Sequence, residues 1–136
     1  MATIVEVDPI YLDNSDLIID TFDYAAAATK VECVPSIKSA TFKGMKKTAT
    51  FTSTSVEAWT LTIDFAQDFE AADSFSNMLF DNQGEIVTVE FAPRSGGKAW
   101  LVDVQLVPGG IGGSVGGHAT TTIALGVLGQ PRRKTP

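Results

Sequence analysis

Two glycine-rich segments are the first candidates for chemistry, because such segments can bind phosphate. Residues 108–117 contain six glycines, and Gly96-Gly97-Lys98 resembles the end of a nucleotide-binding loop. A phosphate loop needs either the spacing G-x-G-x-x-G or a Lys followed by Ser or Thr. The longer segment lacks that spacing, and Ala99 follows Lys98 in the shorter one. We therefore expect the glycines of 108–117 to let a connector bend sharply or to let another backbone approach closely.

Metal binding and acid–base catalysis are the next possibilities. His118 is the only histidine and Cys33 the only cysteine, so a zinc site would need carboxylates, and no ligand spacing is recognisable. The motif G-x-S-x-G is not present, and no Ser or Cys has a base near it in sequence. Carboxylates such as Asp64, Glu90 and Asp103 scatter along predicted solvent faces, and a spatial pair of them stays an open alternative. We expect no enzyme, no cofactor and no metal, with His118 opening the last strand and Cys33 buried as an apolar side chain.

The elements that position these residues are mostly strands. Apolar residues alternate with polar ones in residues 59–65, 87–91, 100–106 and 123–127, and each segment is bounded by Gly, Pro, Asn or Asp. This pattern predicts half-buried antiparallel strands. Residues 17–19 and 31–37 are further strand candidates, and Pro35 favours a sheet edge or a bulge.

One short segment between the first two of these strands has a different period. Phe75, Met78 and Leu79 fall at positions i, i+3 and i+4, Asp73 can cap the start, and Gly84 follows as a stop signal. The pattern predicts a two-turn amphipathic helix. The predicted fold is therefore mainly β, an antiparallel β-sandwich or flattened barrel with one short flanking α-helix.

The chain has the length of one domain, which we place at residues 1–131. Residues 1–14 form a polar, irregular N-terminal arm, residues 39–55 a long loop or hairpin, and residues 109–117 a glycine-rich loop. Residues 132–136 form a basic C-terminal tail. For 39–55, a solvated hairpin tip and a segment that orders only against another subunit are both open alternatives.

The charge of the chain argues against nucleic-acid binding. The net charge is −6, and without Arg132, Arg133 and Lys134 the chain holds 7 basic and 16 acidic residues. Such a body repels a phosphate backbone. The N-terminus lacks the pattern of a signal peptide, no apolar run approaches the roughly 18 residues that a membrane helix needs, and a lone cysteine is typical of a cytoplasmic folding compartment.

The order and spacing of several short motifs between residues 57 and 131 resemble the major tail tube proteins of long, non-contractile-tailed bacteriophages. In order, these motifs are Trp59-Thr60-Leu61, Asp64-Phe65, Asp68, Leu79-Phe80-Asp81-Asn82-Gln83-Gly84, Phe91-Ala92-Pro93, Trp100, Asp103-Val104, Pro108-Gly109, Gly112-Gly113 and Leu125-Gly126-Val127-Leu128-Gly129-Gln130-Pro131.

The resemblance implies a structural protein of the virion tail, made and assembled in the cytoplasm of a host bacterium. Six copies would form a ring, and stacked rings would form a conduit through which double-stranded DNA passes without specific binding. The implied partners are further copies of the chain together with tape measure, tail tip and tail terminator proteins. The family has no catalytic residues, and no membrane insertion of its own is expected.

Particular residues follow as candidates for these roles. The candidates for subunit or ring-stacking contacts are Lys43, Met45, Lys46, Lys47, Gly109, Gly110, Gly112, Gly113, Arg132 and Arg133. The candidates for a face that lines the channel or meets solvent are Thr60, Thr62, Asp64, Thr120 and Thr122.

Two other functions are alternatives. The first is the inner tube of a contractile tail or of a type VI-like secretion system, which a bound sheath protein would distinguish. The second is a small β-sandwich module that binds carbohydrate or protein. Such a module would present exposed aromatic residues on a concave face, whereas Trp59 and Trp100 fall on the apolar sides of their strands.

Overall fold

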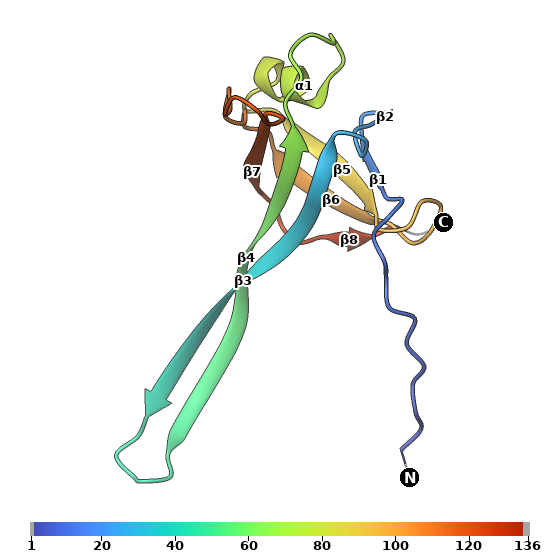
Figure 1. Ribbon diagram of the computed structural model, residues 1–136. Coiled ribbons are helices and arrows are strands. Elements are labelled where there is room, and N and C mark those ends of the chain that lie inside the picture. The colour runs from blue at the N-terminus through green and yellow to red at the C-terminus, as the bar shows by residue number, and fades with distance from the viewer. Residues whose placement is uncertain (1, 135–136) are drawn as a thin grey trace.

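Figure 1 shows the computed structural model, which describes residues 2–134 as two antiparallel sheets and one short helix. The elements are β1 (Asp16–Ile19), β2 (Phe22–Asp23), β3 (Ala28–Lys43), β4 (Thr50–Ala66), α1 (Phe75–Asp81), β5 (Ile86–Ala92), β6 (Trp100–Gln105), β7 (Thr120–Gly126) and β8 (Arg132–Arg133). One sheet has the order β2-β1-β5-β6-β8 and the other the order β3-β4-β7. The mainly-β prediction is confirmed, with strands in 47% and helix in 5% of the described residues.

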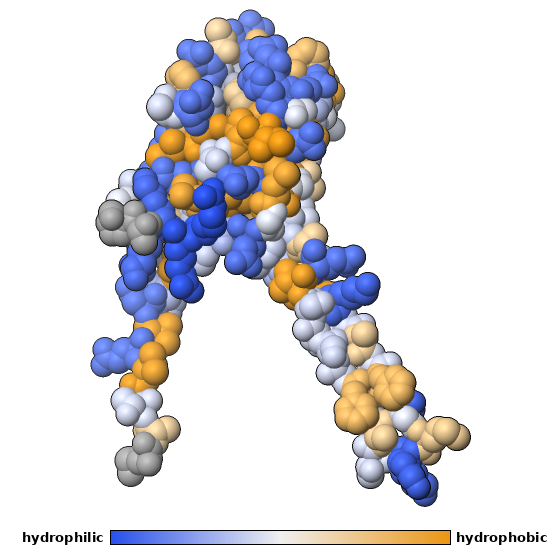
Figure 2. All heavy atoms as spheres, turned by 180° about the vertical axis from the view of Figure 1, so that it is seen from behind, coloured by the Kyte–Doolittle hydropathy of each residue, from blue (hydrophilic) through white to orange (hydrophobic). Residues whose placement is uncertain are grey.

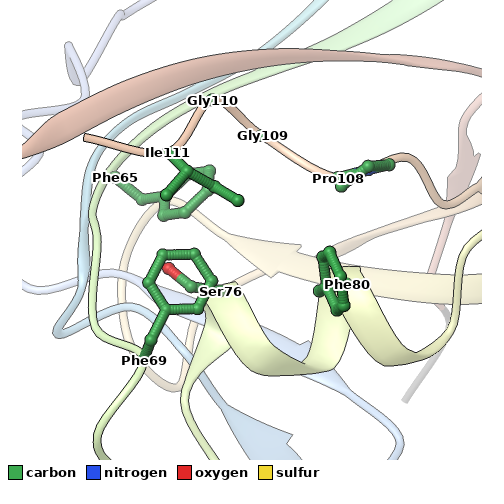
Figure 3. A pocket seen from close by; sticks show the side chains of 8 residues that line it. All are labelled: Phe65, Phe69, Ser76, Phe80, Pro108, Gly109, Gly110 and Ile111. Atoms are coloured by element: carbon green, nitrogen blue, oxygen red, sulfur yellow. The ribbon is translucent and has the colours of Figure 1, made fainter.

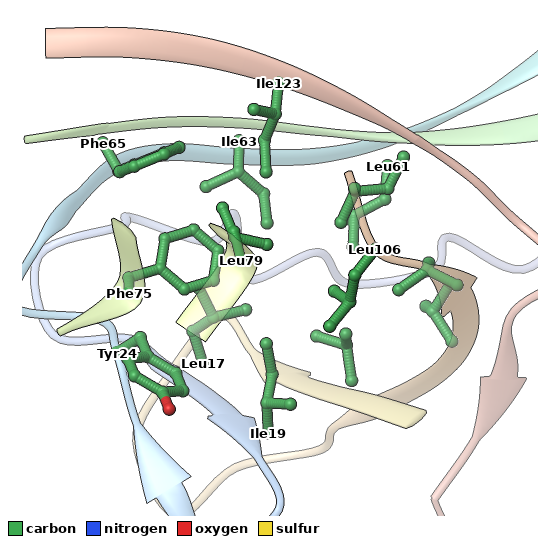
Figure 4. Close-up of a cluster of buried hydrophobic side chains, with 14 residues drawn as sticks. Leu17, Ile19, Tyr24, Leu61, Ile63, Phe65, Phe75, Leu79, Leu106 and Ile123 are labelled. Carbon is green, nitrogen blue, oxygen red and sulfur yellow. The ribbon is translucent and has the colours of Figure 1, made fainter. Parts of the chain in front are cut away.

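The core lies between the two sheets and under the helix (Figure 4). The five-stranded sheet contributes Leu17, Ile19, Val89, Val102 and Val104, and the three-stranded sheet contributes Leu61, Ile63, Phe65, Ile123 and Leu125. All of them are at most 4% exposed. Because alternate residues of each strand point inwards, the period of two in the sequence becomes one continuous apolar layer.

Helix α1 closes one end of this layer with aromatic contacts. The ring of Phe75 packs edge-on against Phe65 at 4.7 Å between centroids and lies 5.2 Å from the ring of Tyr24. Leu79, one turn later, is fully buried. The predicted spacing of Phe75 and Leu79 thus describes the buried side of the helix.

The start of α1 differs from the sequence prediction. Ser74, and not Asp73, is the N-cap, with extended backbone and with its Oγ accepting a hydrogen bond from the Asn77 amide at 3.2 Å. The same hydroxyl donates to the Asp68 carbonyl oxygen. Asp73 lies one residue before the cap position, and the side chain that accepts from the third amide of the helix is that of Ser74. The prediction of Asp73 as the cap is therefore wrong.

Replacement of Ser74 with alanine is expected to lower the free energy of unfolding by about 1 kcal/mol, because an amide at the start of α1 loses its acceptor. Asp73→Ala is the matched control and is expected to change it by less than about 0.5 kcal/mol. Urea denaturation followed by circular dichroism measures both. An equal loss in the two variants would contradict the assignment of the cap.

Strand β3 lies at the edge of the three-stranded sheet, as Pro35 predicts. Its partner β4 is much longer than the predicted strand 59–65, because the Thr/Ser-rich residues before it also pair with β3. Ser36 pairs with Ala58 and Ile37 with Val56, so Glu57 is an extra residue and forms a bulge.

Beyond this bulge, the two strands leave the sandwich as a long hairpin (Figure 1). Residues 39–55, for which the sequence left two alternatives open, form its outer part. Hydroxyl contacts at 3.4 Å join Ser39 to Thr54 and Thr41 to Thr52, and the rings of Phe42 and Phe51 lie 6.3 Å apart. In residues 2–134, no helix is long and apolar enough to cross a membrane.

Candidate assembly surfaces

The residues predicted for a channel or solvent face lie together on the outer side of the three-stranded sheet. Thr60 and Thr62 alternate with buried residues of β4, and Asp64 follows them on the same side. On β7, Thr122 pairs with Asp64, and Thr120 lies one step further along that side. The sheet register therefore gathers all five side chains on one face.

Apart from the exposed side chain of Val34, which pairs with Thr60, the side chains at this face are small or polar, and its charged residues are Lys30, Glu32 and Asp64. The hydroxyl of Thr122 donates to Oδ1 of Asp64 at 2.6 Å, and Lys30 forms an ion pair with Glu32 at 3.3 Å on the adjoining strand. Glu32 pairs with Thr62 across the strands and so belongs to the same face. The short hydroxyl side chains present hydrogen-bonding groups without forming a concentrated positive patch, which phosphate binding would need.

The predicted contact residues separate into three places. Lys43, Met45, Lys46 and Lys47 lie at the end of the hairpin, where the Gly44 amide donates to the Ala49 carbonyl at 2.6 Å. All four side chains are exposed. The glycines and the two arginines lie elsewhere, so the sequence-predicted contact residues do not form one surface.

Arg132 and Arg133 form strand β8 at the edge of the five-stranded sheet and are bound to their own chain. Arg132 forms an ion pair with Asp103 at 3.0 Å, and the Arg133 guanidinium lies 5.6 Å from the ring centre of Trp100. The first two residues of the predicted basic tail therefore lie on a sheet edge, where an acidic and an aromatic side chain of the same chain contact them. Residues 135–136 of the predicted tail lie outside the described residues.

The glycine-rich loop packs on the end of the three-stranded sheet. Gly109 approaches Phe65, Thr121 and Ile123, while Gly112 has a φ of +111°. These are the close approach and the sharp bend that the sequence predicts. Between this loop and α1 lies a hollow of about 10 Å³, lined by aromatic side chains and residues 108–111, with room for one water at most (Figure 3).

Gln67 binds the glycine-rich loop through its side-chain amide, a role that the sequence pattern does not predict. Its side-chain amide donates to the Gly112 carbonyl at 2.8 Å, and its carbonyl oxygen accepts from the Gly112 amide at 2.9 Å. A glutamine after a predicted strand carries no signal of such a partner, because the loop lies 45 residues further along the chain.

Gly109→Ala is expected to lower the free energy of unfolding by about 1–3 kcal/mol, because the added methyl overpacks a filled site. An added Cβ would lie 2.9 Å from Thr121 Cγ2 and 3.1 Å from Phe65 Cζ. Gly117→Ala is the matched control, since its Cβ would meet nothing within 4 Å. Thermal or urea unfolding measures both, and equal stability of the two variants would refute the packing role of Gly109.

The N-terminal arm is less polar than the sequence interpretation held. Residues 2–14 contain no strand or helix and carry six large exposed apolar side chains, namely those of Ile4, Val5, Val7, Ile10, Tyr11 and Leu12. Arg94 ties the arm down through an ion pair with Asp8 at 3.0 Å and a hydrogen bond to the Pro9 carbonyl. The arm and the hairpin both carry apolar patches (Figure 2).

The candidates for chemistry stay apart. Cys33 lies on β3, and partial burial raises the pKa of its thiol. His118 is exposed just before β7. Among residues 2–134, no three His, Cys, Asp or Glu side chains lie together in a way that could hold a metal ion.

No protein-family model matches the chain, and no curated protein sequence matches it either.

Proposed function

We propose that the chain is the structural subunit of a bacteriophage tail tube. The subunits assemble as rings, and the stacked rings form the conduit through which double-stranded DNA leaves the virion. The motif order between residues 57 and 131 supports this proposal, together with the arrangement of sheet edges. The arrangement of sheet edges is the observation on which the proposal mainly rests.

The edge strands of the two sheets differ in length. The five-stranded sheet ends at β2 and β8, which have two residues each, so its edges offer little to a further strand. The three-stranded sheet ends at β3, with 16 residues, and at β7, with 7 residues. In the part of the chain that the structure describes, no strand pairs with the outer edge of β3, and the chain at β7 meets the other sheet only through an isolated bridge between Val127 and Val104. Long unpaired edges on one sheet are a template for strands of neighbouring copies.

A closed ring of such sheets would place one common face around a channel. In that ring the channel face is the polar side with Thr60, Thr62 and Asp64, since the opposite side forms the core. Hydroxyl groups and nearly balanced charge suit a surface past which DNA slides, because each cation on a phosphate would add salt-dependent affinity. Six copies per ring is what the family resemblance implies.

The exposed apolar residues of the arm and the hairpin favour assembly over a lone monomer. Phe42 and Phe51 are 67% and 63% exposed on a projection with no core beneath it. Contiguous exposed apolar groups mark surfaces that are covered in a complex. Tape measure, tail tip and tail terminator proteins are the proposed partners at the two ends of the tube, and the virion tail is the proposed location.

Negative-stain electron microscopy across a concentration series, with mass measured by light scattering, tests the proposal. Rings or hollow tubes of uniform width are expected, either unaided or after addition of tail tip and tape measure proteins. Monomers that fail to assemble with those partners would overturn the proposal. Co-purification of a sheath protein would instead identify the inner tube of a contractile system.

A further inference from the structure

An acidic pocket lies at the end of the molecule that carries β2 and α1. It has a volume of about 260 Å³, with the apolar groups of Phe22, Met78 and Val87 on its walls. Four carboxylate side chains belong to its lining, and no basic residue does. These carboxylates are those of Asp20, Asp73, Asp81 and Glu85.

A tight turn positions the first of these carboxylates at the pocket. Asp20 has a φ of +48° and Thr21 a φ of +71°, and they form the two-residue turn between β1 and β2. Burial, followed by the charges of Asp73 and Asp20, raises the pKa of the Tyr24 phenol in the same pocket. The pocket therefore combines an apolar wall with a negative potential.

The tip of the β3–β4 hairpin, residues 42–49, has the complementary chemistry. Met45 is fully exposed at the turn and is flanked by Lys43, Lys46 and Lys47. In residues 2–134, none of these three lysines forms an ion pair. A flexible, unbranched methionine surrounded by cations is suited to an apolar pocket with an acidic rim.

The pocket and the tip lie at opposite ends of the molecule. Figure 1 shows β2 and α1 at one end of the sandwich, while the hairpin extends away from the other end. One copy therefore cannot fill its own pocket, whereas a second copy placed end to end can. A contact between two different surfaces of the same chain is heterologous, and where it does not close into a ring it repeats from copy to copy along an axis.

We propose that the hairpin tip of one copy inserts Met45 into the acidic pocket of a second copy, with the tip lysines facing the carboxylates of the rim. The contact rests on the proposed function in one respect, since in a tube it would join successive rings. The apolar insertion supplies contact area, while the charges set the orientation and speed the encounter.

Charge reversal on each side tests the contact in the full-length protein. Lys46→Glu/Lys47→Glu and Asp81→Lys/Glu85→Lys are each expected to weaken self-association by about tenfold or more in sedimentation velocity at low salt. Asp20 is left unchanged, since its positive φ disfavours most replacements. Lys98→Glu is the control, since Lys98 is exposed and belongs neither to the pocket lining nor to the tip, and it is expected to associate like the wild type.

Rescue distinguishes this contact from a general effect of charge. The chain that carries all four reversals has the net charge of the wild type and is expected to associate again. An equimolar mixture of the two double variants is also expected to associate, because the acidic tip of one then meets the two introduced lysines of the other, while the lysine tip of the second meets the unchanged acidic pocket of the first. If neither the fourfold variant nor the mixture recovers, the proposal is overturned.

Disulfide trapping separates this proposal from the proposed function. In a Cys33→Ser background, Met45→Cys and Met78→Cys chains are expected to form a mixed disulfide on mild oxidation, while each alone yields much less dimer. Tubes without the mixed disulfide would overturn the tip–pocket contact and leave the tube function standing. Formation of the mixed disulfide without rings or tubes would support the tip–pocket contact and overturn the tube function.

Discussion

Phe75→Ala is expected to lower the free energy of unfolding by about 3–5 kcal/mol, the usual loss for a buried aromatic side chain. Phe75 is 2% exposed and packs between Phe65 and Tyr24, so its removal leaves a cavity and two aromatic rings without their partner. Urea denaturation below the concentration of assembly measures the effect, because there the unfolding reports the subunit alone.

Phe80→Ala is the control on the same helix. Phe80 is 50% exposed at the hollow between α1 and the glycine-rich loop, and its replacement is expected to cost less than about 1 kcal/mol. A comparable loss in the two variants would show that α1 does not bury Phe75 in solution.

Replacement of residues 37–57 with Asn-Gly is expected to abolish tube assembly and to leave the body folded. Ser36 and Ala58 form the last strand pair before the bulge, so a two-residue turn can close the shortened hairpin there. None of the buried core residues comes from the removed segment. Electron microscopy measures assembly, and circular dichroism with thermal unfolding measures the fold.

Phe42→Thr/Phe51→Thr serves as the companion variant, since it keeps the hairpin length and removes its exposed aromatic pair. Assembly by this variant alone would assign the effect to length, and failure of both would assign it to the apolar pair. Tubes of normal width from the shortened chain would refute a role of the hairpin in assembly.

The sandwich could be predicted from the sequence because its strands alternate strongly. Residues such as Leu61, Ile63 and Phe65 are separated by polar residues, and burial of one face follows directly from that pattern. The outer hairpin gave a weaker signal. Its Thr and Ser residues differ little in hydropathy from face to face, so the sequence did not distinguish a strand from a loop.

The acidic pocket could not be predicted, because its lining comes from three segments that are distant in the chain. Asp20 belongs to the first turn, Asp81 to the end of the helix, and Leu106 follows β6. Arg132 is a second example: the sequence shows only clustered basic residues, whereas the fold places Asp103 of the sheet beside it as a partner. Spatial neighbours of this kind depend on topology, which local patterns do not contain.

The bulge at Glu57 has a consequence for mutation of the hairpin. Even-numbered residues of β4 face outward in the body, but the extra residue shifts the phase, so that odd-numbered residues such as Phe51 continue that outward face. Because β3 carries no extra residue, deletion of Glu57 would keep pairs such as Phe42–Phe51 on the same face and would remove only the local bend and extra twist of the bulge. The direction in which the hairpin leaves the body therefore depends on one inserted residue far from its tip.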